Sequence, residues 1–172
     1  MLLDLSRIRS ADERFERRYS PNTFPKEDGF SIVEPVSLAF DVHKDKRHFQ
    51  LAGTLRTTLE LSCSRCLEPF VWPVDATFDL RYQPQTQNVG EGEREIEEDD
   101  LSTAFYENDT IDLGQLMREQ FYLSLPMKPL CREDCQGLCP VCGTNLNRAT
   151  CGCTRGWDDP RMAALKALKR NT

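Results

Sequence analysis

The sequence predicts an α+β fold: an antiparallel β-sheet or partly closed barrel with a few helices and a C-terminal cysteine-rich, metal-binding tail. Three observations lead to this prediction. Apolar residues alternate with polar ones over three stretches of the first half, an amphipathic helical pattern follows, and six of the eight cysteines lie between residues 131 and 153. Alternation with a period of two is typical of strands that have one buried and one solvated face. We therefore expect a β-rich core domain at residues 1–127 and a tail with a terminal helix at 128–172.

The three alternating stretches are the expected strands. They read VSLAFDV at 36–42, HFQLAGTLRTTLEL at 48–61 and FVWPVDATFDLRY at 70–82. The connections between them are short, so neighbouring strands should pair antiparallel. Pro73 lacks an N–H group, which predicts a sheet edge or a bulge at that point.

A short helix is expected near the N-terminus. Ser10 and Glu13 have the spacing of a capping box, in which each side chain bonds the backbone amide of the other residue. This pattern predicts a helix through ERFERR, residues 13–18, on which Phe15 and Tyr19 lie four positions apart and pack together. We interpret it as a polar surface helix rather than an arm that grips RNA.

The second half of the core should contain a short strand, a turn and a longer helix. TAFYENDTIDL, residues 103–113, predicts the strand, with the turn at Asn108-Asp109. Asp112 can cap the helix that follows, and Pro126 requires that helix to stop near Leu125. The apolar stripe of this helix is expected to be core: Leu113, Leu116, Met117 and Phe121.

Two further segments are defined by charge. Residues 83–100 show no apolar periodicity, and the last ten of them hold seven acidic groups, so we expect a disordered, solvated loop. Such a loop could also mimic nucleic acid or hold a basic protein. In the tail, Asp158, Asp159 and Pro160 predict the start of another helix.

Charge and hydropathy restrict the classes of function. The chain has no run of 18 apolar residues and its first residues lack the pattern of a secretory signal, so we expect a cytoplasmic protein without a membrane partner. A net charge of −6 argues against a general nucleic-acid coat. The tail is the basic end, with eight basic and four acidic groups in residues 128–172, and its candidate contacts to RNA or a protein partner are Arg132, Arg148 and Arg155.

The most specific motif is Cys139-Pro-Val-Cys142-Gly143. Clustered cysteines in a cytosolic protein indicate metal binding rather than disulfides. Two thiolates separated by two residues can bind one metal ion from a tight turn whose amides face the sulfurs, and Gly143 permits a positive φ after the second ligand. Cys139 and Cys142 need two further ligands, and three arrangements remain open. The ligands could be Cys135 with Cys153 or Cys151 with Cys153, or the cysteines could form a binuclear cluster with shared thiolates.

A second pair, Cys63-Ser-Arg-Cys66, lies between two expected strands and therefore at a hairpin tip. This pair supplies half of a tetrahedral site. Because the chain has eight cysteines, we hypothesise that the tip takes two more from the tail, so that two four-cysteine Zn²⁺ sites result. The alternative is a thiol-redox or zinc-handling protein that uses Cys63 and Cys66, although redox dithiols usually lie where a strand meets a helix.

Catalytic residues are not expected. The two histidines, His43 and His48, lie near a predicted hairpin turn and adjoin no cysteine or serine motif. A zinc ion with four thiolate ligands has no open position for water, and the sequence contains no phosphate-binding glycine loop. We therefore expect a protein that is not an enzyme and has no small-molecule substrate.

Several of these segments together resemble the YceD family of large ribosomal RNA subunit accumulation proteins. The matching segments are CSRCLEPF at 63–70, IDLGQLMREQFYLSLPMKPLC at 111–131, CQGLCPVCGTNLN at 135–147, CGC at 151–153 and DPRMAALKAL at 159–168. The resemblance implies a bacterial or organellar factor for the synthesis, processing or stability of large-subunit ribosomal RNA (ribosome biogenesis), with that RNA or a basic ribosomal protein as partner. It also implies a zinc-binding element, whose ligands would be Cys131, Cys135, Cys139, Cys142, Cys151 and Cys153.

Overall fold

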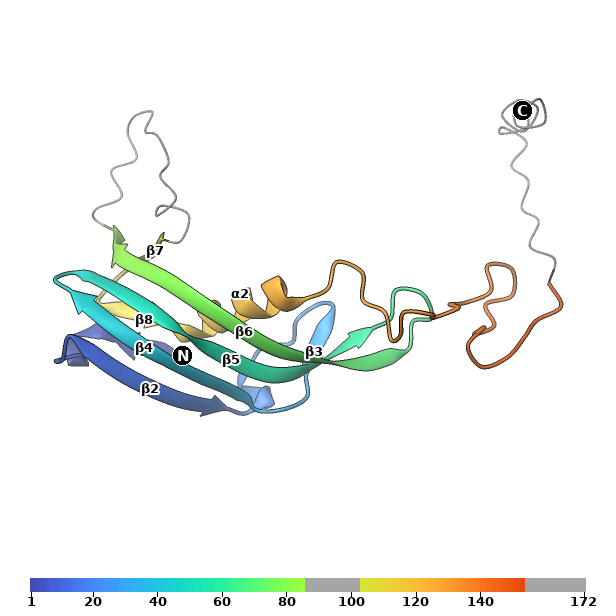
Figure 1. The fold of residues 1–172 in the computed structure, drawn as a ribbon, viewed down its shortest axis with the longest axis horizontal. Coiled ribbons are helices and arrows are strands. Elements are labelled where there is room, and N and C mark those ends of the chain that lie inside the picture. Colours follow the sequence, from blue (N-terminus) through green and yellow to red (C-terminus); the bar gives the residue numbers. More distant parts are fainter. Residues whose placement is uncertain (86–102, 154–172) are drawn as a thin grey trace, which may run out of the picture.

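The structure is a computed structural model that describes residues 1–85 and 103–153. The N-terminal half contains β1 (Leu2–Asp4), η1 (Leu5–Arg7), β2 (Asp12–Tyr19), η2 (Pro21–Thr23), β3 (Phe30–Ile32) and β4 (Val36–Asp45). The rest contains β5 (His48–Ser62), β6 (Pro69–Pro84), β7 (Thr103–Tyr106), β8 (Thr110–Asp112) and α2 (Leu113–Ser124). A long curled sheet forms most of the molecule, and the cysteine-rich segment continues from one of its ends (Figure 1). The expected α+β class is confirmed.

The main sheet has six strands. Five follow the order β2-β4-β5-β6-β7, and β3 pairs with the far end of β5. The neighbours β4–β5 and β5–β6 pair antiparallel, as their short connections predicted, whereas β6 and β7 are parallel. Because β7 meets β6 only from Arg81 to Pro84, Pro73 has a strand on one side alone within the described residues, which agrees with the predicted edge position.

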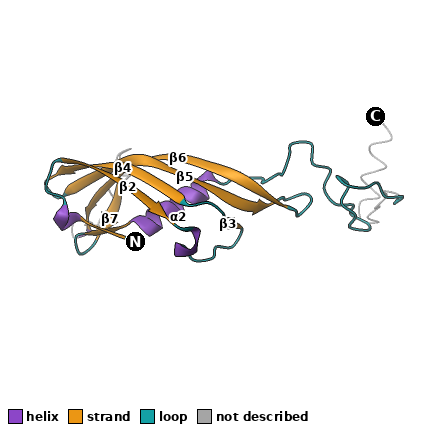
Figure 2. Cartoon of the chain, turned by 90° about the horizontal axis from the view of Figure 1, so that it is seen from below, coloured by secondary structure: helices purple, strands orange, loops and turns teal. Residues whose placement is uncertain are grey.

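One face of the sheet forms the core. The alternating residues of β4 are buried, and β5 adds Leu51, Leu55 and Leu59. Helix α2 and the short helices lie on this side of the sheet (Figure 2). The four predicted core residues of α2 are all buried: Leu113, Leu116, Met117 and Phe121. The helix begins and ends as expected, with the Asp112 carboxylate accepting a hydrogen bond from the Gly114 amide and Ser124 as the last residue.

The predicted helix at residues 13–18 is wrong, because this segment forms strand β2. Eight residues of β2 pair with β4, from Asp12 opposite His43 to Tyr19 opposite Val36. Residues four apart share a face in a strand as well as in a helix, so the Phe15/Tyr19 spacing did not separate the two structures. Phe15 stacks on Phe40, with ring centroids 5.3 Å apart. A local cap contributes about 1 kcal/mol, less than an eight-residue ladder with a buried aromatic contact.

The predicted turn before β8 is confirmed, since Asn108 and Asp109 have φ of 51° and 53°. The expected acidic loop begins later than predicted, because β6 continues through Gln83 and Pro84, which pair with β7. Residues 86–100 of that loop, Arg155 and the expected helix from Asp158 lie outside the described residues. Within the described chain, every helix is too short or too polar to cross a membrane.

Candidate metal centres

The eight cysteines lie in two groups of four, and each group could hold a metal ion. In each group the four sulfurs are within 4.8 Å of one another. The first centre consists of Cys63, Cys66, Cys131 and Cys135. The second centre consists of Cys139, Cys142, Cys151 and Cys153. Cys135 thus lies with the hairpin pair and not with Cys139, and this is one of the divisions that the two-site hypothesis allows.

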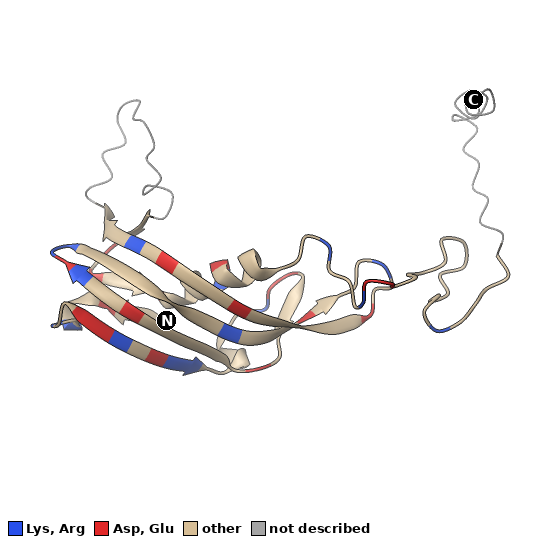
Figure 3. Cartoon of the chain, viewed as in Figure 1, with Lys and Arg blue, Asp and Glu red and all other residues tan. Residues whose placement is uncertain are grey.

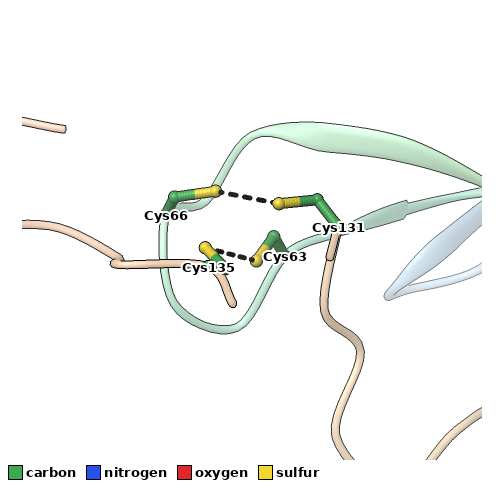
Figure 4. Close-up of side chains that lie close together, drawn as sticks. All are labelled: Cys63, Cys66, Cys131 and Cys135. Atoms are coloured by element: carbon green, nitrogen blue, oxygen red, sulfur yellow. Dashed lines mark hydrogen bonds between the residues drawn. The ribbon is translucent and has the colours of Figure 1, made fainter. Parts of the chain in front are cut away.

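The sulfur spacing in the first centre suits a tetrahedral ion. The Sγ atoms of Cys63 and Cys135 are 3.8 Å apart, and those of Cys66 and Cys131 are 3.7 Å apart (Figure 4). A disulfide would bring two sulfurs to about 2.05 Å. An ion with four metal–sulfur bonds of about 2.3 Å in tetrahedral geometry places its ligands about 3.8 Å from one another. The donor set therefore fits a metal with four thiolate ligands.

The hairpin between β5 and β6 presents Cys63 and Cys66 on a tight turn. The Cys63 amide donates to the Glu68 carbonyl at 2.9 Å, and the Leu67 amide donates to the Cys63 carbonyl at 2.9 Å. This turn requires a left-handed residue directly after the second cysteine, and Leu67 has φ of 61°. An L-residue with a side chain is strained in that conformation.

The second centre repeats the same turn. The Cys139 amide donates to the Thr144 carbonyl at 2.8 Å, and the Gly143 amide donates to the Cys139 carbonyl at 2.9 Å. Gly143, with φ of 74°, occupies the position that Leu67 has in the hairpin. The left-handed conformation predicted for Gly143 is confirmed, whereas a leucine in the equivalent place gave no sequence signal.

The two residues between Cys63 and Cys66 hold the tail against the hairpin. The Ser64 amide donates to the Pro129 carbonyl at 2.8 Å, before Cys131 in the chain. The Arg65 carbonyl accepts from the Leu138 amide at 3.1 Å, and the Arg65 guanidinium donates to the Cys135 carbonyl at 2.8 Å. The tail is thus bound to the hairpin on both sides of its two ligands.

The first centre is buried and its thiols differ in acidity. Cys63, Cys66 and Cys135 are buried and pack with Phe70. Burial raises the pKa of the Cys63 thiol, but hydrogen bonds from nearby backbone amides outweigh burial and lower this pKa to about 6. Burial and the neighbouring thiols raise the pKa of Cys131 to about 12. Since thiolates this close repel one another, a cation is needed to keep all four ionised.

The second centre is more open to solvent. Cys139 is buried, Cys142 is exposed, and Cys151 and Cys153 are half-buried. The Thr144 hydroxyl lies 3.1 Å from the Cys142 sulfur, and it lowers the pKa of Cys142 to about 6 together with the Thr144 amide. The adjacent Cys142 and burial raise the pKa of Cys153 to about 12. As in the first centre, low and high thiol pKa values occur side by side.

Arg132 and Arg148, the candidate contacts for a partner, already face acidic groups of their own chain. The Arg132 side chain lies 3.3 Å from the Asp134 carboxylate. The Arg148 side chain lies 2.5 Å from the Glu68 carboxylate. Both basic and acidic residues lie along the strands of the sheet (Figure 3).

Sequence reasoning missed Asn147, which contacts the first centre. Its side-chain amide donates to the Cys135 sulfur at 3.3 Å. Asn147 lies between Cys142 and Cys151 in the sequence, so the spacing of the cysteines places it in the loop of the second centre. The sequence held only a weak signal for this contact: Asn147 is the last residue of CQGLCPVCGTNLN, one of the segments that resemble the YceD family.

Comparison with known proteins gives the relatives of the chain. A family model described as "Large ribosomal RNA subunit accumulation protein YceD" matches residues 51–169. The chain is 28% identical over 142 residues to "Large ribosomal RNA subunit accumulation protein YCED homolog 1, chloroplastic" of Zea mays, an alignment that covers 70% of this chain and 48% of the maize protein. It is 28% identical over 156 residues to the Arabidopsis thaliana protein of the same name, which covers 78% of this chain and 49% of that protein.

A bacterial relative is the "Uncharacterized protein Rv2926c" of Mycobacterium tuberculosis, 34% identical over 116 residues, covering 67% of this chain and 53% of that protein. The chain spans about half the length of these three curated relatives. No solved structure matches it. Since the family model covers well over half of its residues and includes all eight cysteines, the chain belongs to the YceD family.

Proposed function

We propose that this protein is a non-catalytic factor that supports the synthesis, processing or stability of large-subunit ribosomal RNA in the cytoplasm. The observation that carries the proposal is the family match over residues 51–169, which includes both cysteine centres. The maize and Arabidopsis relatives are named for large ribosomal RNA subunit accumulation.

Both centres would hold Zn²⁺ in a structural role. Each offers four thiolates, and a zinc ion with four protein ligands has no position for a reacting water. When bound, the ion neutralises part of the thiolate charge. In the first centre, Cys63 and Cys66 would bind it together with Cys131 and Cys135, so that the ion joins the tail, residues 128–172, to the core, residues 1–127.

The tail would make the contact with large-subunit RNA. Arg132 and Arg148 would bind phosphate by exchanging their present carboxylate partners, Asp134 and Glu68, for it. Arg155 would add a third cation. A basic ribosomal protein would instead be held by the acidic segment at 83–100. Crosslinking in cells, followed by identification of the attached RNA and the attached protein, separates these two partners.

Depletion of the protein tests the function. We expect the ratio of large-subunit to small-subunit ribosomal RNA to fall, and to recover when the wild-type chain is supplied. A chain with Cys63→Ser and Cys66→Ser should not restore the ratio, whereas the exposed Ser31→Ala variant should. An unchanged ratio after depletion would contradict the proposal. Purified protein that cleaves RNA would contradict its non-catalytic part.

A thiol-redox or zinc-handling role is the second candidate, and the low pKa of Cys63, about 6, favours it. Burial of both Cys63 and Cys66 argues against it, because a redox thiol must reach its partner. Rapid disulfide exchange at Cys63 in zinc-loaded protein would support this role. Slow exchange that begins only after a chelator is added would support the structural one.

A further inference from the structure

The segment that links the two ligand pairs of the second centre, residues 143–150, contacts the first centre. Asn147 makes the closest contact, with its Nδ2 atom donating to Cys135 Sγ at 3.3 Å. Its Oδ1 atom accepts from the Gln136 amide at 2.8 Å and from Arg132 Nη2 at 2.7 Å. One side chain therefore holds both a sulfur of the first centre and the backbone next to that sulfur.

The same segment also reaches the hairpin half of the first centre. Arg148 Nη2 lies 2.5 Å from Glu68 Oε1. The Glu68 carbonyl accepts the hydrogen bond from the Cys63 amide that closes the hairpin turn. Asn147 and Arg148, adjacent in sequence, thus contact the tail ligand and the hairpin turn respectively.

The second centre is attached to both ends of this segment. The segment is flanked at its two ends by Cys142 and Cys151, whose sulfurs belong to one group of four. Between these ends, the Leu146 amide donates to the Gly137 carbonyl at 2.9 Å, and the Asn145 carboxamide oxygen accepts from the Asn147 amide at 2.9 Å. An ion bound by Cys142 and Cys151 would fix both ends of the segment, and Asn147 would be held in place.

We propose that Asn147 is a positioning residue for the first centre, and that through it metal binding at the second centre raises the metal affinity of the first. This inference rests on the proposal that both centres bind zinc. An N–H donor to a ligand sulfur orients the thiolate and offsets its charge, and the loss of such a partner typically lowers metal affinity about 10–100-fold. Coupling between two binding sites is reciprocal. Metal at the first centre must therefore raise the metal affinity of the second centre by the same factor as metal at the second centre raises that of the first.

The experiment uses the full chain loaded with Zn²⁺ and reads the first centre directly. A chelator is titrated in, and alkylation of Cys63 and Cys66 is followed by mass spectrometry. Asn147→Ala should expose these cysteines at a chelator concentration that corresponds to about tenfold weaker binding. Thr150→Ala, at an exposed position of the same segment, is the matched control and should behave as wild type.

A second background tests the coupling itself. Cys151→Ser with Cys153→Ser removes half of the second centre, so the first centre should again lose about tenfold in affinity. Adding Asn147→Ala to this background should cause little further loss, because the asparagine is no longer held in place. Asn147→Asp keeps an acceptor for Gln136 and Arg132 but removes the donor to sulfur. It should lose at least as much affinity as Asn147→Ala, and it serves if the alanine variant does not fold.

Several results would overturn the inference. One is wild-type protection of Cys63 and Cys66 in the folded Asn147 variants. Another is an equal, additive loss from Asn147→Ala in both backgrounds. If the wild-type protein binds two zinc ions and the variants give either result, the inference about Asn147 is overturned and the two-site proposal stands. Wild-type protein that binds no zinc overturns the two-site proposal and the coupling with it.

Discussion

The two cysteine centres use the same turn but are assembled in different ways. In the first centre, the sulfurs that face each other come from residues 72 and 65 positions apart in the chain. In the second centre, all four lie between residues 139 and 153. The first centre is built from the end of the β-sheet and the tail, so its geometry requires the folded sheet, whereas the second can close within one short segment. A metal that binds only the folded arrangement stabilises the fold, and this effect should be larger at the first centre.

Removal of each centre in turn should give the largest effects. Cys63→Ser with Cys66→Ser should lower the free energy of unfolding of the zinc-loaded protein by several kcal/mol, since structural zinc sites bind with roughly 10 kcal/mol. Cys151→Ser with Cys153→Ser should affect the sheet much less. Thermal unfolding followed by circular dichroism, with zinc counted per chain, measures both. Equal losses of Tm in the two variants would remove the distinction between the centres.

The same contrast explains what could be predicted from the sequence. The strands at 36–42, 48–61 and 70–82 were predicted because burial on one face is encoded every second residue. The division of the cysteines could not be predicted, because Cys135 lies only four positions from Cys139 and its membership depends on contacts with Arg65 and Asn147. Asp12–Tyr19 was misassigned because its capping pattern is local and its pairing with β4 is not. The parallel position of β7 also had no local signal.

Two glycines offer a matched test of where the backbone is crowded. A Cβ on Gly137, which has φ of 72°, would lie 3.0 Å from the Arg65 carbonyl oxygen. A Cβ on Gly143, with φ of 74°, would have no neighbour within 4 Å. Gly143→Ala should therefore cost about 1 kcal/mol from the left-handed backbone alone, and Gly137→Ala about 2–3 kcal/mol because the tail must also shift away from the hairpin. Denaturant unfolding of zinc-loaded protein measures both values, and an equal cost would show that the contact with Arg65 is not tight.

Leu67, the residue after the Cys63 and Cys66 pair, should give a smaller effect of the opposite sign when it is replaced by glycine. Leu67 is left-handed and two-thirds exposed, at 66%, so its side chain gains little from packing. Leu67→Gly should relieve about 1–2 kcal/mol of backbone strain, of which roughly half is offset by the greater freedom of glycine in the unfolded chain. We expect a net gain of about 0.5–1 kcal/mol in unfolding free energy. A loss of stability would mean that the exposed leucine makes contacts that outweigh its strain.

The smallest expected effect concerns the ion pair between Arg148, in the segment at 143–150, and Glu68, in the hairpin of the first centre. The side chain of Arg148 is mostly exposed and that of Glu68 is about one-third exposed, at 35%, so water screens their attraction. Arg148→Gln should cost only about 0.5 kcal/mol in the free energy of unfolding. Its effect on chelator resistance of the first centre should also be much smaller than that of Asn147→Ala, because Arg148 contacts a carboxylate and Asn147 contacts a ligand sulfur. If Arg148→Gln instead released zinc as readily as Asn147→Ala, the hairpin half of the first centre, rather than Cys135, would be the point where the second centre acts.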